Sequence, residues 1–199
     1  MQGKRSASRP SSPPLSARAR PSAPDADLST LRLTDRVRPG VRVLFVGINP
    51  GVRSALINHH FAGHSNRFWK LLFDSGLVPE PIACADDDRL PEWGFGITNL
   101  IPRPTPGIDT LVAADYHAGL VELRRKVRRW KPRVVALVGV TLYRFVFGIP
   151  PREPVAVGEQ RDTFEGARVF VLPNPSGRNA NFSYAEMRAA YAALGSHRP

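Results

Sequence analysis

The chain has 199 residues and a formal net charge of +11, which suits one domain with a well-formed core and favours polyanionic partners. Four of its 28 basic residues are Lys, which leaves 24 Arg, a bias that codon usage in a GC-rich genome would also produce. The single cysteine, Cys84, excludes a disulfide framework and any cysteine-ligated zinc or iron–sulfur site, and it fits a reducing cytoplasm.

The first 30 residues have the composition of a disordered basic arm. Residues 1–24 contain five prolines and five basic residues but no acid and almost no large apolar side chain, so they cannot bury enough surface to offset ordering. This composition also resembles an organelle transit peptide, although the prolines argue against the amphipathic helix that such a peptide needs. We expect the arm to add non-specific affinity for nucleic acid, and residues 31–199 to form a single domain.

Apolar runs alternate with helical patterns from residue 41 onward. The run 41–47 predicts a buried strand, and residues 65–76 predict a helix with Ser65 as its N-cap and Gly76 as its stop. The later predicted elements are strands at 93–101, 133–139 and 167–173, and helices at 110–130, 141–147 and 183–194, the last capped by Ser183. The longest apolar run, 134–140, is too short to span a bilayer, so no membrane partner is expected.

Continuous apolar strands alternating with helices predict an α/β fold in which a mostly parallel sheet is covered on both faces. In such sheets ligands bind beyond the carboxyl ends of the strands. Two of the predicted strands end on similar Asn-Pro turns, at Asn49-Pro50 and at Asn174-Pro175. If these strands are parallel, both turns lie on the same edge and can face one pocket.

Four sequence blocks occur in order along the chain: GINPG at 47–51, FAGHSNRFWKLL at 61–72, GITNLIPRPT at 96–105 and LPNPSG at 172–177. Together they resemble the mismatch-specific uracil-DNA glycosylase family, which includes the thymine-DNA glycosylases and lies within the uracil-DNA glycosylase superfamily. The resemblance extends from about Val41 to about Leu194. It implies a fold of three layers, an α/β/α sandwich. It also implies an enzyme that flips a base out of duplex DNA and hydrolyses its N-glycosidic bond.

The resemblance also implies that Asn49 positions the attacking water. Glycosidic cleavage passes through an oxocarbenium-like state, so the enzyme needs an oriented water and a stabilised leaving base. An Asn carbonyl can accept a hydrogen bond from that water but cannot take its proton at neutral pH. The faster uracil-DNA glycosylases carry Asp at this position and His where this chain has Asn174, so both departures predict a slow enzyme.

The base-binding candidates likewise come from the resemblance. Phe61 matches the ring that stacks on the flipped base, although from the sequence alone a core Phe is an equal alternative. The backbone of Gly47 and Ile48 is expected to border the edge of the base. The other candidates for the base pocket are Ser54, Asn99 and Asn174.

The loop after the second Asn-Pro turn matches the wedge that fills the gap left by a flipped base. Its candidate residues are Ser176, Gly177, Arg178 and Asn179. The run after Gly177 departs from the family pattern, which leaves the identity of the plug open. Arg178 can stack or form hydrogen bonds there, and the alternative is a solvated loop arginine.

Three other features invite a functional interpretation: a group of histidines and two charged runs. The histidines His59, His60 and His64 suggest a metal site, but Gly63 interrupts any helix there and no carboxylate cluster completes the ligands, so neither a metal nor an organic cofactor is expected.

The two charged runs are also ambiguous. The run Asp86–Asp88 is predicted to be a solvated loop rather than a magnesium site. The basic run 124–129 would either contact DNA phosphates or form a solvated helix end, where cations favour the helix dipole.

The sequence therefore favours a monofunctional DNA glycosylase, since neither Asn-Pro motif contains a Lys that could act as a lyase nucleophile. We expect a cytoplasmic monomer, associated with the nucleoid in a bacterium, that acts on duplex DNA carrying a mispaired or damaged base. No Phe, Tyr or Trp lies between Pro50 and Phe61, so the pocket is expected to be open near the C5 atom of the base. Uracil opposite guanine is expected to be its best substrate, and uracils with small C5 substituents or cytosines with an etheno-type adduct should also be processed.

Two alternatives remain open from the sequence. One is a non-catalytic DNA-binding module that uses the same pocket to sense lesions. The other is a nucleotide-binding α/β hydrolase, although the segment GINPGVRS lacks the glycine spacing and the lysine of a phosphate-binding loop.

Overall fold

The computed structural model describes residue 28 and residues 30–195, so the prediction of a disordered arm falls almost entirely outside the described residues. The strands are β1 (Val43–Gly47), β2 (Phe95–Asn99), β3 (Val134–Val138), β4 (Gly158–Phe164) and β5 (Ala167–Leu172). The helices are α1 (Val52–Ile57), α2 (Phe68–Asp74), η1 (Cys84–Trp93), η2 (Ile108–Thr110), α3 (Ala113–Trp130), α4 (Val140–Phe147) and α5 (Tyr184–Gly195), where η denotes a 3-10 helix. Every strand and helix predicted from the sequence is present, with shifted ends.

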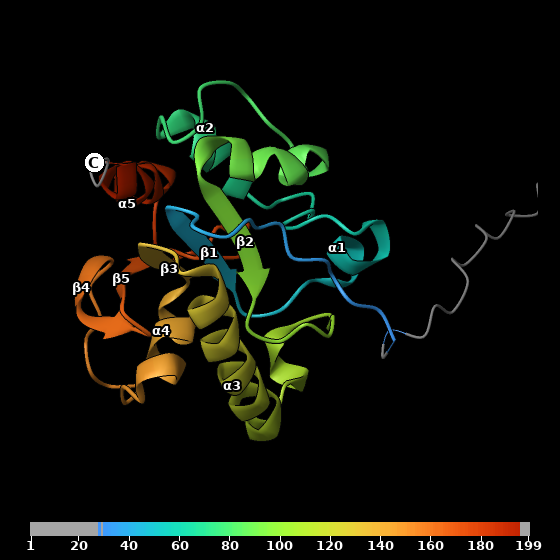
Figure 1. Cartoon of the computed structure of the whole chain (residues 1–199), viewed down its shortest axis with the longest axis vertical. Helices are drawn as coiled ribbons and strands as arrows, with labels where there is room; N and C mark the ends of the chain where they lie inside the picture. The colour runs from blue at the N-terminus through green and yellow to red at the C-terminus, as the bar shows by residue number, and fades with distance from the viewer. Residues whose placement is uncertain (1–27, 29, 196–199) are drawn as a thin grey trace, which may run out of the picture.

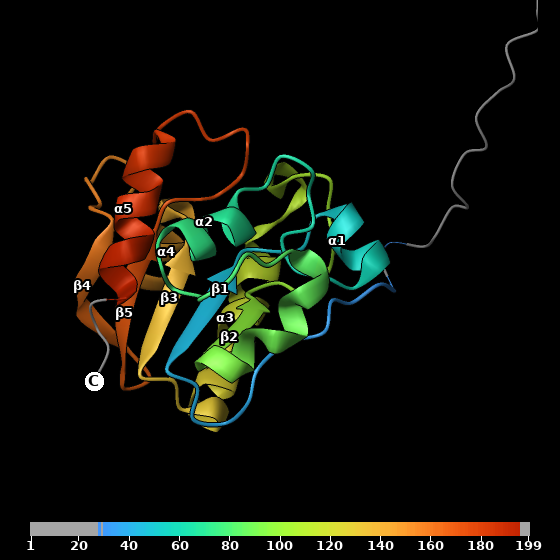
Figure 2. The same cartoon turned by 90° about the horizontal axis from the view of Figure 1, so that it is seen from above.

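The strands form one sheet in the order β2-β1-β3-β5-β4. Strands β2, β1, β3 and β5 are parallel, and β4 pairs antiparallel with β5 at one edge. Figure 1 shows α2 and α5 above the sheet and α3 and α4 below it, and Figure 2 shows the same arrangement turned by 90°. The predicted three-layer α/β/α sandwich is therefore confirmed.

Alternate residues of the central strands pack into two separate cores. Val43 and Phe45 of β1 face the core that includes Phe68 of α2. Leu44 and Val46 face the opposite core, beneath α3 and α4. Because both faces of the strand are buried, its sequence is a continuous apolar run rather than an alternating one.

The structure departs from the prediction at the start of α2. The helix begins at Phe68, whose N–H donates to Oδ1 of Asn66 at 3.0 Å, so Ser65 is not the N-cap. Ser65 instead packs against the wedge loop, because a Cβ atom added at Gly177 would lie 2.5 Å from the Cβ of Ser65. Ser65 therefore takes part in tertiary packing, although the local sequence pattern predicted that it caps the helix.

Strand β4 and helix α1 were not predicted. The sequence of β4, GEQRDTF, is mostly polar because the strand lies at the edge of the sheet with exposed side chains. Helix α1 has only six residues and follows directly on the first Asn-Pro turn. Neither element carries the long apolar pattern on which sequence prediction depends.

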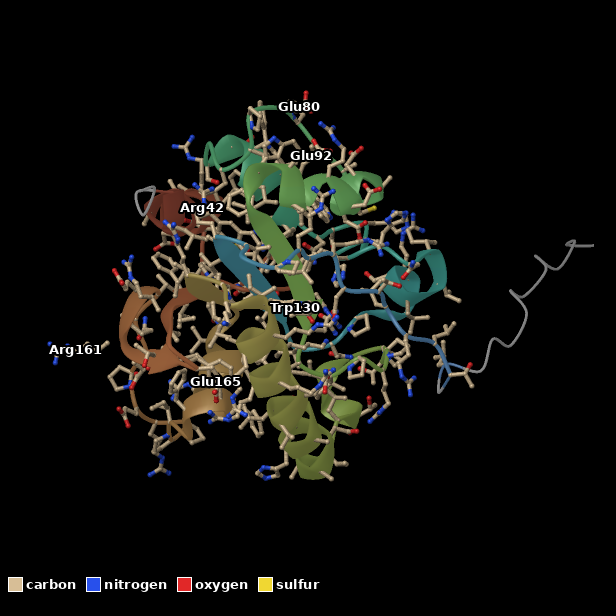
Figure 3. The ribbon with its side chains drawn as sticks, in the orientation of Figure 1. Arg42, Glu80, Glu92, Trp130, Arg161 and Glu165 are labelled. Atoms are coloured by element: carbon tan, nitrogen blue, oxygen red, sulfur yellow. The ribbon has the colours of Figure 1, made fainter. Side chains whose placement is uncertain are left out.

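The basic run at the end of α3 is largely paired with acids. Arg124 and Arg128 both bind Glu165, which lies beside α3 in Figure 3, and Arg125 binds Glu122. Because α3 leads directly into β3, its last turn lies near the amino ends of the strands, opposite the edge where ligands bind. These observations favour the solvated helix end over a DNA-contacting surface. Among the described helices, none is long and apolar enough to cross a membrane.

The segment 30–38, called the strap below, runs along the outer edge of β2. Arg36 forms an antiparallel bridge with Ile97, with N···O distances of 3.0 and 2.8 Å. Its guanidinium also donates to Oδ1 of Asp87 at 2.8 Å. Asp87 is fully buried in η1 and accepts the N–H of His60 at 2.9 Å, so the prediction that Asp86–Asp88 form a solvated loop is wrong for this residue.

His60 ties the strap to the rest of the fold. Its Nε2 lies 3.0 Å from the carbonyl oxygen of Thr34, and the side chain is buried. Burial lowers the pKa of His60 from 6.5 to about 4. The ring is therefore neutral at neutral pH and donates a single N–H to the strap.

The low pKa of His60 makes stability depend on pH. In the unfolded chain the histidine takes up a proton below pH 6.5, whereas in the folded protein it does so only near pH 4. Stability is therefore complete above pH 6.5 and falls as the pH decreases toward 4, by about 3 kcal/mol for a shift of this size. Urea unfolding at a series of pH values measures this loss.

The variant His60→Gln should lose most of the pH dependence in that window because glutamine does not titrate. His64→Gln is the matched control, since His64 is exposed. A His60→Gln protein with the same pH slope as the wild type would contradict this account.

Candidate active site

The two Asn-Pro turns lie on the same edge of the sheet, as predicted, because β1, β3 and β5 are parallel neighbours. Between them is a pocket of about 710 Å³. The predicted site residues that line this pocket are Gly47, Ile48, Asn49, Ser54, Phe61, Asn99, Asn174, Ser176, Gly177, Arg178 and Asn179, which is the complete predicted set. The chain thus brings together residues from both ends of the domain.

Asn49 is held in one orientation by its amide nitrogen. Its Nδ2 donates to Oγ1 of Thr105 at 2.7 Å and to the carbonyl oxygen of Pro50 at 3.2 Å. The Thr105 hydroxyl in turn donates to the carbonyl oxygen of Gly107 at 2.6 Å. Within the described part of the chain no group donates to Oδ1 of Asn49, so this oxygen remains available to a water in the pocket.

Thr105 ends the block GITNLIPRPT, but its role in the site was not predicted from the sequence. The residue is 3% exposed, and its N–H donates to the carbonyl oxygen of Pro50 at 3.2 Å. The backbone of the loop after β2 is therefore tied to the first Asn-Pro turn as well. A lone threonine among prolines gives no signal of this role in the sequence.

Asn99 lies directly beside Gly47, which it opposes in the register of β1 and β2. A Cβ atom added at Gly47 would lie 2.6 Å from Oδ1 of Asn99, so a larger residue there would displace the Asn99 amide. Nδ2 of Asn99 lies 3.5 Å from Nδ1 of His60, at the limit of a hydrogen bond. Since the neutral His60 ring donates through Nε2, its Nδ1 accepts, and Oδ1 of Asn99 is left as an acceptor in the pocket.

Phe61 forms an aromatic wall of the pocket. Its ring stacks on Phe68, with centroids 4.2 Å apart and planes inclined by 23°. Phe68 is fully buried and meets Phe45 of β1 edge to face, so the stack is anchored in the core. The backbone of Phe61 adopts a left-handed conformation (φ 49°), which the surrounding contacts must maintain.

Ser54 lines the pocket and also fixes the loop that carries Phe61. Its Oγ accepts the N–H of Ala62 at 3.0 Å, while Nε of Arg53 donates to the carbonyl oxygen of Ala62 at 2.9 Å. These contacts from α1 hold the residue that follows Phe61, so the position of the aromatic wall depends on α1.

The predicted wedge loop is held by hydrogen bonds within the loop and from Arg67. Oδ1 of Asn174 accepts the N–H of Ser176 at 3.0 Å, and Nδ2 of Asn179 donates to the carbonyl oxygen of Asn174 at 2.8 Å. The Arg67 guanidinium donates to the carbonyl oxygens of Ser176 and Asn179 at 2.7 and 3.3 Å. Arg178, at the tip, is exposed. The supporting role of Arg67 was not predicted from the sequence.

The three histidines near the pocket have separate surroundings. His59 contacts Asp87 through Nδ1 at 3.1 Å, His60 contacts the strap, and His64 is exposed. Across residues 28 and 30–195, no group of three or more His, Cys, Asp or Glu side chains is arranged to hold a metal ion.

Comparison with known proteins agrees with this geometry. The model of the uracil DNA glycosylase superfamily matches residues 34–195. Among solved structures, the chain is similar to the solution NMR structure of a candidate uracil DNA glycosylase from Methanosarcina acetivorans, with a TM-score of 0.52 and 18% identity over 83% of this chain and 98% of that chain. At that identity the likeness supports the fold alone, whereas the family match covers most of this sequence. The chain therefore belongs to the uracil DNA glycosylase superfamily.

Proposed function

We propose that this protein is a mismatch-specific, monofunctional uracil-DNA glycosylase that acts on duplex DNA, with uracil opposite guanine as its best simple substrate. The observation that carries the proposal is the fixed orientation of Asn49, whose Nδ2 is held by Thr105 while Oδ1 is available at the pocket. Membership of the superfamily supports the reaction class. The +11 charge supports a polyanionic partner, and a cytoplasmic monomer is part of the proposal.

In the proposed reaction, Oδ1 of Asn49 accepts a hydrogen bond from a water beside C1′ of the flipped nucleotide. The water oxygen bonds to C1′, and the electron pair of the glycosidic bond leaves on N1 of the base. Asn49 cannot take the water proton at neutral pH, so this proton passes to solvent and the departing base is protonated from solvent. The gain comes from positioning the water and stabilising the leaving base.

Asn99 and Phe61 supply base selection in this proposal. Phe61 presents a ring supported by Phe68, which suits stacking on a flipped pyrimidine. The available Oδ1 of Asn99 accepts a hydrogen bond from the N3–H of uracil. Unmodified cytosine has no hydrogen on N3, so its lone pair would face the same oxygen. A site that leaves a buried polar pair unmatched rejects the wrong ligand strongly.

The second candidate is a non-catalytic module that senses lesions with the same pocket. The observation that favours it is that, among the described residues, the hydrogen-bond partners of Asn49 are Thr105 and Pro50, neither of which is a general base. Incubation of the protein with a duplex containing one U·G pair separates the candidates: an enzyme releases free uracil and leaves an abasic site, whereas a sensor binds without releasing the base.

Replacing Asn49 tests the mechanism. Asn49→Ala should lower the single-turnover rate of uracil release about a hundredfold or more, because the water loses its orientation, while DNA affinity stays within a few-fold of the wild type. Thr105→Val keeps the Asn49 amide but removes the hydroxyl that accepts its hydrogen bond. The single-turnover rate should fall about tenfold, which corresponds to the loss of one hydrogen bond. Rates close to wild type in Asn49→Ala would remove Asn49 from the mechanism.

Replacing Arg178 tests the wedge. Arg178→Ala should slow excision from the more stable U·A pair more than from the U·G mismatch, since a plug matters most where unpairing costs most. Arg188→Ala, which removes the same charge from the exposed face of α5, is the matched control. Equal losses on both pairs, or a loss in the control as large as in Arg178→Ala, would show that Arg178 is not the plug.

A panel of duplexes that differ only in the target base tests the proposed specificity. Uracil opposite guanine should be released fastest, and uracils with small C5 substituents should also be processed because no Phe, Tyr or Trp follows Pro50 before Phe61. Thymine opposite guanine should be released slowly, if at all, since a methyl group changes binding by about 1–3 kcal/mol. Restriction to unsubstituted uracil, with equal rates opposite guanine and adenine, would refute this specificity.

A further inference from the structure

Leu33 of the strap is a buried aliphatic residue that belongs to neither core. It is 7% exposed, yet it is part of neither the cluster around Phe68 nor the cluster beneath α3. Instead it lines the pocket that contains Asn49 and Asn99. A side chain buried against a pocket rather than in a core contributes to the shape of that pocket.

The strap places Leu33 at the inner end of the pocket. Because Arg36 pairs antiparallel with Ile97, the strap residues that precede Arg36 run past the carboxyl end of β2, where Asn99 lies. Thr34 is fixed there from two sides, since its N–H donates to Oδ1 of Asn58 at 3.0 Å and its carbonyl oxygen contacts His60. Leu33 is thus held next to the pair formed by Asn99 and His60.

The orientation of a flipped pyrimidine follows from the same geometry. Its N1 must lie near Asn49, where the glycosidic bond is cut, so the opposite edge of the ring, with N3 and C4, points inward. Gly47 lies two positions before Asn49 along the chain, and Asn99 is its partner on β2. Asn99 is 7% exposed and lies at that inner end of the pocket. Atoms added to N3 or C4 would therefore extend toward Leu33 and Thr34.

We propose that Leu33 is a specificity-determining residue, which limits how far a base can extend beyond its N3–C4 edge. The proposal rests on the glycosylase function proposed above and assigns to the strap the inner wall of that site. An aliphatic wall also keeps water from the hydrogen bond between the base and Asn99, which strengthens that bond. Substituents on C5 project from a different edge of the ring. The release rate of C5-substituted bases should therefore not depend on Leu33.

The test compares bases enlarged at different edges. Single-turnover release is measured from duplexes that carry uracil, 3,N4-ethenocytosine, which is enlarged across N3 and C4, or 5-hydroxymethyluracil, which is enlarged at C5. Leu33→Ala should raise the ratio of ethenocytosine to uracil rates about tenfold or more, and Leu33→Phe should lower it by a similar factor. The ratio of 5-hydroxymethyluracil to uracil rates should not change in either variant.

Rate ratios cancel any difference in the folded fraction between variants, so a merely destabilised protein does not mimic the effect. Val37→Ala is the matched control, because Val37 lies on the same strap but packs over Gly96, where its Cγ2 is 2.8 Å from the position of an added Cβ. This control should leave both ratios at their wild-type values.

The outcomes separate this proposal from the one on which it rests. Uracil release with an unchanged ethenocytosine ratio in both Leu33 variants would overturn the role of Leu33 and leave the glycosylase function standing. A shift of the C5 ratio as large as that of the ethenocytosine ratio would also overturn it. If the wild type releases none of the three bases, the glycosylase function fails and this proposal fails with it.

Discussion

The close contact between Gly47 and Asn99 is the constraint on which the pocket depends. The two residues are register partners in β1 and β2, and any side chain at Gly47 would collide with the Asn99 amide. The missing side chain leaves room for the Asn99 amide beside Gly47, and the ends of these two parallel strands form the floor of the site. Asn49 follows two residues after Gly47, so the first Asn-Pro turn begins directly at this floor. A parallel sheet thus supplies the site with a rigid base before any loop is considered.

The loops around this floor are fixed mainly by hydrogen bonds to backbone carbonyl groups. Arg67 at the start of α2 donates to the carbonyl oxygen of Ser176 in the wedge loop, and the N–H of Thr105 after β2 donates to the carbonyl oxygen of Pro50 in the first Asn-Pro turn. Each support comes from a segment distant in sequence from the loop that it fixes. A site that works by positioning needs such supports because a small displacement of the water or of the base is costly.

The sequence predicted the layers, the order of the main elements and eleven of the residues that line the pocket, because these depend on apolar runs, turn residues and the family motifs. It failed where a residue acts through a distant partner. Asp87 lies in a run of acids that looks solvated, yet it is fully buried beneath Arg36 and His60. Ser65 looks like a helix cap but packs against Gly177. No local pattern reveals these contacts, since each is created by the folding of remote segments.

Asn49 and Asn99 present dipoles rather than charges to the proposed substrate. Asn49 is bonded to Thr105 and Pro50, and Asn99 contacts His60, whose low pKa keeps it neutral at neutral pH. With no ionised group in these contacts, Asn49 and Asn99 would not accelerate the reaction by taking up a proton. The rate would then depend on how readily the base departs as an anion and on how easily it leaves the helix. A mispaired base leaves the stack more easily than a paired one, so a weakly catalytic, well-ordered pocket can itself favour mismatches without any residue that recognises the opposite strand.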